Sequence, residues 1–131
     1  MKRKLSFFLL MLLLLNVLFG TMAVAESRES QAFKATTIAL TTSLFAEFRA
    51  TTNRNYSTIK VSSCSLQEMN GSTVVSSITL QVPQATATNT DSFNTTKDYS
   101  QNGTHGKSYR IKATFWADGY TVTAYSRIIN Y

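Results

Sequence analysis

The stretch from Gly106 to Tyr125 constrains the fold more than any other part of the chain, because it has the pattern of a β-hairpin. Asp118-Gly119 lies between two alternating runs, and Asp-Gly suits a type I′ turn, in which both central residues need positive φ. The apolar positions of the two runs are Tyr109, Ile111, Ala113, Phe115, Tyr120, Val122 and Ala124. This pattern predicts two antiparallel strands with one buried face.

The turn also predicts the register of the two strands. Counting outward from Asp118-Gly119 gives the pairs Ala117–Tyr120, Trp116–Thr121, Thr114–Thr123, Lys112–Tyr125 and Arg110–Arg127. Since successive residues of a strand point to opposite faces, the residues between the apolar positions share the outer face.

Residues 1–25 have the pattern of a cleaved signal peptide. A basic start at Lys2-Arg3-Lys4 precedes a nearly unbroken apolar run, and Ala23-Val24-Ala25 offers the small residues of a cleavage site. The apolar run is shorter than the roughly 20 residues of a membrane span, so we expect its removal rather than a retained membrane helix. The mature protein then starts at Glu26 and is secreted, and it meets the membrane only through the signal peptide.

The mature chain has the size of one small domain, because removal of 25 residues from 131 leaves 106. We expect a flexible segment at residues 26–32 and one domain over residues 33–131. Lys+Arg fall from 13 to 10 against 7 acids, so the net charge falls from +6 to about +3. This value argues neither for nor against a nucleic acid partner, but the lack of a Lys/Arg-rich run and an extracellular location argue against one. We expect a monomer.

Alternation with period two continues upstream of the hairpin. One run divides at Thr41-Thr42-Ser43, and its spacing also permits a helix, which the high threonine content disfavours. The apolar positions of this run are Ile38, Leu40, Leu44, Ala46, Phe48 and Ala50. Asn53-Arg54-Asn55 indicates a turn. Between Tyr56 and Met69 the apolar positions change parity, which predicts a β-bulge near Ser62-Ser63.

Further turn signals complete an all-β pattern. Asn70-Gly71 indicates a second hairpin. Its second strand carries Val74, Ile78, Leu80 and Val82, with Val75 out of register and Pro83 at its end. A short edge strand is expected near residues 85–93, followed by a surface loop. The resulting six or seven short strands predict a single antiparallel β-sandwich.

Cys64 is the only cysteine, so the chain cannot form an internal disulfide. A lone thiol in a secreted protein can react or pair between chains, but we expect Cys64 to be a small buried hydrophobe. Secreted proteins of Gram-positive bacteria often lack disulfides, which favours a bacterial source.

The segment from Gly106 to Phe115 resembles the sixth strand of fibronectin type III and related immunoglobulin-like domains, where Gly-x-x-Tyr precedes alternating inward residues. The resemblance implies that Tyr109 is a corner tyrosine, with its ring in the core and its hydroxyl on a nearby backbone group. The paired cysteines of antibody domains and the early tryptophan of fibronectin type III domains are absent, since the only tryptophan is Trp116. The chain also resembles small secreted proteins of Gram-positive bacteria that have no known role.

The sequence contains no pattern of catalytic residues. His105 is the only histidine and lies in a Gly-flanked turn, so with Cys64 it forms a weak nucleophile–base pair at best. A structural zinc site needs about four Cys/His ligands, and we expect neither a metal nor a cofactor. The expected protein is therefore not an enzyme. The alternative from another class is a small secreted hydrolase that uses an Asp/Glu pair, and a third is a structural or antagonism protein without a small ligand.

The outer face of the hairpin is the candidate binding surface, because it is basic and aromatic. Its candidate ligand-binding residues are Arg110, Lys112, Trp116, Tyr125 and Arg127. We expect Lys112 to lie over the ring of Tyr125, and the paired arginines to bind a carboxylate or phosphate bidentately. The predicted function is that of a secreted, non-catalytic domain that contacts an anionic polymer, glycan or protein of a bacterial surface. The alternative is an ordinary solvated face.

Overall fold

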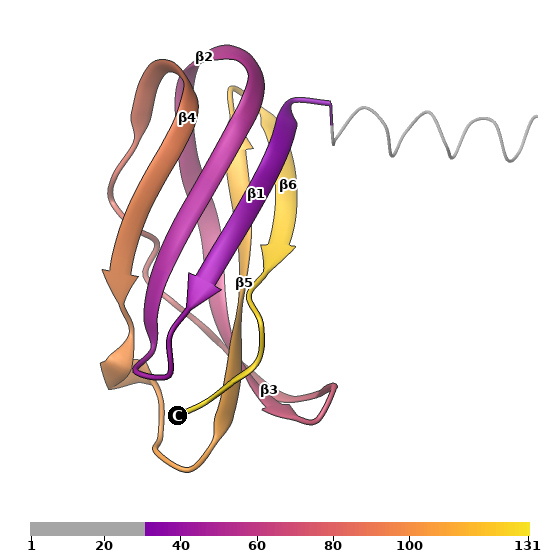
Figure 1. Ribbon diagram of the computed structural model, residues 1–131, viewed down its shortest axis with the longest axis vertical. Helices are drawn as coiled ribbons and strands as arrows, with labels where there is room; N and C mark the ends of the chain where they lie inside the picture. Colours follow the sequence, from indigo (N-terminus) through magenta and orange to yellow (C-terminus); the bar gives the residue numbers. More distant parts are fainter. Residues whose placement is uncertain (1–30) are drawn as a thin grey trace, which may run out of the picture.

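A computed structural model describes residues 31–131 as an all-β domain (Figure 1). The predicted signal peptide at residues 1–25, and residues 26–30 of the predicted flexible segment, lie outside the described residues. The elements are β1 (Phe33–Leu40), β2 (Phe45–Asn70), β3 (Thr73–Thr79), β4 (Ala87–Asp98), the 3-10 turn η1 (Ser100–Asn102), β5 (Ser108–Ala117), β6 (Tyr120–Tyr125) and β7 (Ile129–Asn130). No helix in residues 31–131 is long and apolar enough to cross a membrane.

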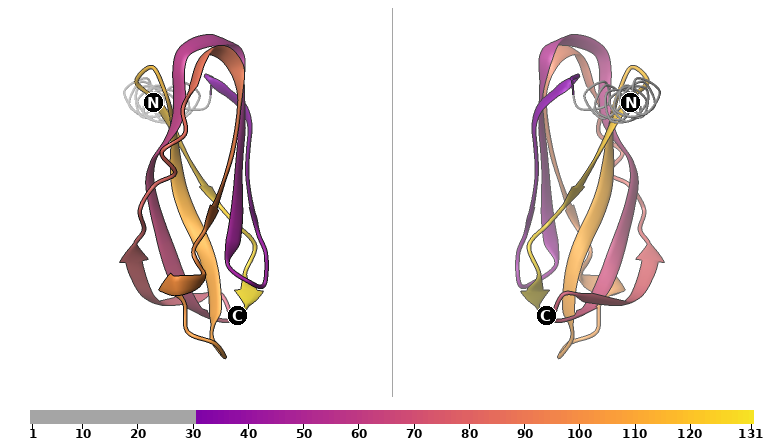
Figure 2. Two further views of the ribbon diagram at one scale, coloured as in Figure 1. Left: turned by 90° about the vertical axis from the view of Figure 1, so that its left-hand side faces the viewer. Right: turned by 90° about the vertical axis from the view of Figure 1, so that its right-hand side faces the viewer.

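All seven strands belong to one antiparallel sheet, which folds over into two layers (Figures 1 and 2). In the first layer, residues 46–52 of β2 pair with β1 on one side, and residues 45–51 pair with residues 92–98 of β4 on the other. In the second layer, residues 59–69 of β2 pair with β5, which pairs with β6, while β3 pairs with the far side of β2. The predicted antiparallel β-sandwich of six or seven strands is confirmed.

β2 is one continuous strand of 26 residues that arches from the first layer to the second (Figure 1). The turn predicted at Asn53-Arg54-Asn55 lies in this arch but is continuous strand, so its prediction as a separator of two strands is wrong. The register with β4 shifts between Thr51 and Tyr56, where β2 follows the longer outer path of the bend. β4 follows the same bend and is therefore longer than the short edge strand expected near residues 85–93.

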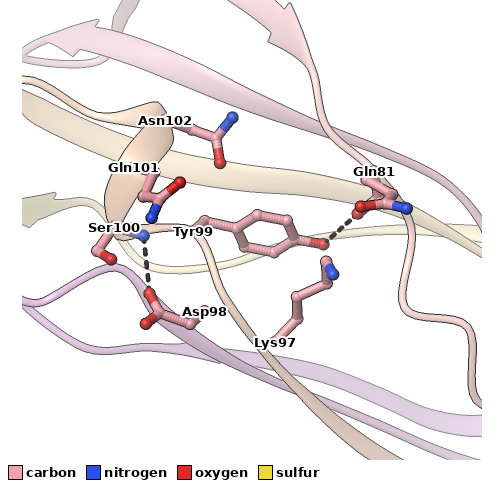
Figure 3. Close-up of a pocket in the computed structure, with 7 residues that line it drawn as sticks. All are labelled: Gln81, Lys97, Asp98, Tyr99, Ser100, Gln101 and Asn102. Carbon is pink, nitrogen blue, oxygen red and sulfur yellow. Dashed lines mark hydrogen bonds between the residues drawn. The ribbon is translucent and has the colours of Figure 1, made fainter.

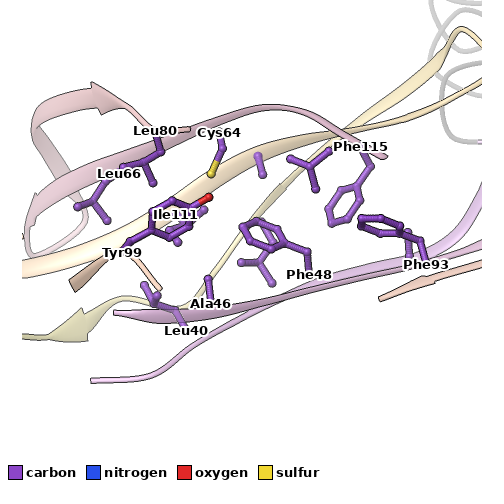
Figure 4. Packing of buried hydrophobic residues seen from close by; sticks show 14 of the residues in the cluster. Leu40, Ala46, Phe48, Cys64, Leu66, Leu80, Phe93, Tyr99, Ile111 and Phe115 are labelled. Atoms are coloured by element: carbon purple, nitrogen blue, oxygen red, sulfur yellow. The ribbon is translucent and has the colours of Figure 1, made fainter. Parts of the chain in front are cut away.

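The core fills the space between the layers (Figure 4). Phe115 of the second layer packs edge-on against Phe48 and Phe93 of the first, with ring centroids 6.4 Å apart in both pairs. All six apolar residues of the first predicted run are buried, and five of them lie in β1 or β2, so the run forms strands rather than a helix. Cys64 is buried, and burial raises the pKa of its thiol to about 11. The predicted burial of Cys64 as a small core residue is confirmed.

Several local predictions are confirmed by the register. Residues Val61 and Ser63 of β2 face Phe115 and Thr114, which are adjacent in β5, so the predicted bulge lies at Ser62. In the hairpin of β2 and β3, Val75 has no partner, because Met69 pairs with Val74 and Glu68 with Ser76. The ring of Tyr109 is buried, and its hydroxyl oxygen accepts the Thr104 backbone N–H at 2.9 Å.

The end of the predicted flexible segment is fixed rather than free. Ala32 is buried, and its carbonyl accepts the Asn53 N–H at 3.0 Å. The Asn53 side-chain amide also donates to the carbonyl of Gln31. The domain therefore starts before Phe33, at the point where the chain docks against the arch of β2.

Candidate functional site

The hairpin of β5 and β6 has the predicted register from its turn down to Lys112. The pairs from Ala117–Tyr120 to Lys112–Tyr125 are all present. Asp118 and Gly119 have φ values of 45° and 95°, as a type I′ turn requires. Alternation along β5 then buries Tyr109, Ile111 and Phe115 and leaves the intervening residues on the outer face of the second layer.

The first cluster on this face surrounds the ring of Tyr125. The Arg110 guanidinium carbon lies 4.6 Å from the ring centroid, and the Lys112 ammonium nitrogen lies 6.0 Å from it. Arg110 Nε also donates to the buried Gln67 Oε1 at 2.7 Å, across the β2–β5 pair. The predicted contact of Lys112 with Tyr125 is confirmed, and Arg110 lies over the same ring.

A second cluster lies toward the turn end of β5. The Lys60 ammonium nitrogen is 4.8 Å from the centroid of a Trp116 ring, and these two residues are directly paired across β2 and β5. Lys60 was not among the candidates from the sequence, because its neighbour comes from a strand more than fifty residues away. Its position between the buried Ile59 and Val61 marks it as outward-facing, but only the register places it at Trp116.

Arg127 does not join these clusters as predicted. The β5–β6 ladder ends at Lys112–Tyr125 and resumes as Tyr109–Ile129, one residue out of step. The buried Ser126 takes up this shift, since its hydroxyl oxygen accepts the Ile111 N–H at 2.8 Å. The direct Arg110–Arg127 pair is therefore wrong, because the irregular segment after β6 removes Arg127 from the ladder. We call Lys60, Arg110, Lys112, Trp116 and Tyr125 the cationic face.

The cations of this face have no acidic partner among residues 31–131. The two ion pairs of this part of the chain are Lys107–Glu68, at 3.1 Å, and Arg49–Glu47. The other outward residues that the register places beside them are Ser63, Ser65, Gln67, Ser77, Thr79, Thr114, Thr121 and Thr123. Since none of these is acidic, the cations contact aromatic rings, solvent and, for Arg110, the neutral Gln67 amide.

A polar hollow of about 410 Å³ lies elsewhere, where β4 ends in η1 (Figure 3). The Tyr99 hydroxyl donates to the Gln81 carbonyl at 2.8 Å. Asp98 accepts the Ser100 N–H at 2.8 Å, and this bond lowers the pKa of the Asp98 carboxyl. The remaining lining residues are Lys97, Gln101 and Asn102. Asp98 is the only acid among the described residues that line the hollow, so residues 31–131 offer no second carboxylate there for glycoside hydrolysis.

Neither His105 nor Cys64 belongs to a reactive cluster in the described part of the chain. His105 is exposed and stacks on Tyr131, with ring centroids 4.1 Å apart. Cys64 lies in the core, where its raised pKa keeps the thiol protonated at neutral pH. Within residues 31–131, no three His, Cys, Asp or Glu side chains lie close enough together to bind a metal.

No family model, curated protein or solved structure matches the chain.

Proposed function

We propose that this protein is a secreted, non-catalytic binding domain that contacts an anionic polymer of a bacterial surface through the cationic face. The observation that carries the proposal is the first cluster, in which Arg110 and Lys112 lie over one ring of Tyr125 and form no ion pair within residues 31–131. Arginine binds carboxylate and phosphate groups through two parallel hydrogen bonds. The contacts of Arg110 with Tyr125 and Gln67 hold its guanidinium in place before a ligand binds.

The layout of the face favours an extended ligand over a small anion. Lys112 and Trp116 are four residues apart on β5, which at roughly 3.4 Å per residue separates the two clusters by about 14 Å. A small anion cannot contact both clusters at that distance. A linear polymer with repeated carboxylate or phosphate groups can, and an acidic glycan or a phosphate-containing wall polymer has this chemistry.

The proposal extends to an immunoglobulin-like arrangement of a protein from a Gram-positive bacterium. The pairing order supports the first part: β1 and β4 flank the first half of β2, while the second half pairs with β5 and then β6. This division agrees with the ABE and CFG strands of immunoglobulin-like domains, and the bond from Thr104 N–H to Tyr109 agrees with a tyrosine corner. The signal-peptide pattern and the lack of disulfides support the second part.

Retention on anionic matrices tests the function. We compare wild type with the pair Arg110→Gln, Lys112→Gln on purified Gram-positive cell walls and on immobilised heparin, in a rising salt gradient. The matched control is the pair Lys34→Gln, Arg49→Gln, which removes the same charge from the first layer, where both side chains are exposed. Salt elutes the protein because it screens exposed charges over about 8–10 Å. We expect the Arg110→Gln, Lys112→Gln protein to elute at much lower salt than wild type and the control, because it lacks the two cations of the first cluster.

Two results contradict the proposal. Equal loss in both pairs would mean that net charge alone causes retention. Unchanged retention of a folded Arg110→Gln, Lys112→Gln protein would leave the face as ordinary solvated surface.

A further inference from the structure

The edge of β3 differs from the other sheet edges of the described chain. β2 is the only strand that pairs with β3, and all seven residues of β3 are exposed. Natural proteins protect free edges with charged residues, with proline, with β-bulges or with cover from another element. β3 has one bulge, at Val75, but residues 76–79 are regular, the strand contains no charge and no proline, and Figure 2 shows it projecting from the layers.

The other edges are protected. β4 carries Asp91, Lys97 and Asp98 on its length. β1 carries Lys34 and contacts β6, so these two edges cover one another. β3 instead exposes three large apolar side chains, with Val74 at 40%, Val75 at 58% and Ile78 at 43% exposure. A free, uncharged edge with apolar side chains is suited to pairing with another strand.

The direction of the free backbone groups on β3 follows from one bond at its end. The Leu80 N–H donates to the Cys64 carbonyl at 2.9 Å. Leu80 and every second residue before it, Ile78 and Ser76, therefore direct their backbone groups toward β2. Hydrogen-bonded and non-bonded pairs alternate in an antiparallel ladder. Ser77 and Thr79 therefore direct their N–H and C=O groups outward, with no partner in the described chain.

We propose that a second copy of this chain pairs with β3 along its free edge, as an antiparallel dimer. The twofold axis of this dimer passes between the Ser77 residues of the two copies. In that register Ser77 faces Ser77, Val75 faces Thr79, and Ser76 faces Ile78 of the other copy. The centre of the new pair uses the regular part of β3, residues 76–79, and Val75, the bulge residue, lies at each end of it. The same uncharged segment meets itself, so no like charges oppose one another across the new pair.

The proposal replaces the monomer expected from the sequence, and it stands without the polymer-binding function. It does have a consequence for that function. A twofold axis perpendicular to the sheet joins the two second layers edge to edge and leaves both cationic faces on the same side. Two faces on one surface can bind a single polymer with increased avidity.

Sedimentation analysis over a dilution series of the purified mature protein tests the dimer. We expect wild type to have twice the chain mass at high concentration. Val75→Lys places a cation opposite Thr79 on each side of the axis, and Ser77→Pro removes the outward N–H groups at the centre of the pair while leaving the bonds to β2. Both variants are expected to sediment at half the wild-type mass, with thermal unfolding showing that they remain folded.

Phe45→Lys is the matched control, because Phe45 is also apolar, is 42% exposed and lies at the start of β2 in the first layer. It should remain dimeric. A monomeric wild type at every concentration would overturn the proposal. A folded Val75→Lys variant that remains dimeric would also overturn it, and equal dissociation of Phe45→Lys would assign association to general apolar exposure rather than to the β3 edge.

Discussion

The two faces of β5 consist of alternate residues of one strand, yet different interactions hold their side chains. On the inner face, Ile111 and Phe115 are fully buried and Tyr109 nearly so. On the outer face, Arg110 and Lys112 remain at the surface and lie over an exposed aromatic ring. The inner residues are fixed by packing against the first layer, and the outer residues are fixed by their immediate neighbours on the sheet.

The energies of the two faces differ enough to separate folding from function. Full burial of a large apolar side chain contributes about 1.5–3 kcal/mol. An exposed cation–π contact contributes only about 0.5–1 kcal/mol. The stability of the fold therefore depends mainly on the residues of the inner face and only weakly on which residues occupy the outer face. A cluster of unpaired cations on the outer face is thus more informative about binding than about stability.

Truncation of Tyr109 should give the largest effect, because it removes an inner-face ring. By analogy with other aromatic deletions, Tyr109→Ala is expected to cost about 3–5 kcal/mol of unfolding free energy. Tyr109→Phe removes only the bond from the Thr104 N–H and should cost about 0.5–1.5 kcal/mol, since Thr104 is exposed and water can replace the hydroxyl. Denaturant titration measures both.

A neutral Tyr109→Ala would contradict the burial of the ring. Equal costs for the two variants would mean that the hydroxyl, rather than the packing of the ring, fixes this end of β5. Either result would weaken the contrast between the faces.

The two faces were also predictable to different degrees. The register near Asp118-Gly119 follows from a two-residue turn, so Lys112–Tyr125 could be counted from the sequence. Lys60 could not be placed at Trp116 without the long-range β2–β5 register. Arg127 was misplaced because counting assumes a regular ladder, which the buried Ser126 interrupts.

The arch of β2 was missed for a similar reason. Asn53-Arg54-Asn55 has the composition of a turn, and local preferences favour one there. Pairing of β4 along both halves of β2, a contact between distant segments, keeps the bend in the sheet. Sequence patterns predicted the local alternation of the strands but not which distant strands lie beside one another.

A smaller effect is expected at Asp118, where the hairpin turn meets the arch. Its carboxylate accepts the N–H groups of Ser57 at 2.8 Å and Thr58 at 3.1 Å, and these bonds lower the pKa of the Asp118 carboxyl. A folded pKa below the unfolded value of about 3.9 stabilises the fold above that pH. The contribution is lost as the pH falls through the folded pKa.

Asp118→Asn keeps a side chain that tolerates the turn but has one acceptor oxygen for two donors. We expect lower stability than wild type at pH 7, with the difference closing below about pH 4. Asp91→Asn on β4 is the control for loss of one negative charge. Thermal unfolding across pH measures all three proteins, and a difference between Asp118→Asn and wild type that is independent of pH would exclude the carboxylate as its source.

Arg110→Lys should have the smallest effect on stability and the sharpest effect on the proposed binding. The substitution keeps the charge but removes the planar group over Tyr125 and the Nε bond to Gln67. The loss of unfolding free energy should be about 0.5–1.5 kcal/mol, because the bond to Gln67 is lost while the lysine ammonium can still lie over the ring of Tyr125. Lysine binds anions as a point charge, whereas arginine can bind them bidentately, so retention on cell walls should nevertheless weaken.

The reciprocal variant Lys112→Arg supplies the matched control, because it also keeps the charge of the face and adds a planar group beside the same ring. Its retention should equal or exceed that of wild type. If Arg110→Lys were retained on cell walls as strongly as wild type, the face would bind through its net charge alone. The outer face would then contribute less to stability than the inner face, and the identity of its cations would not matter for binding.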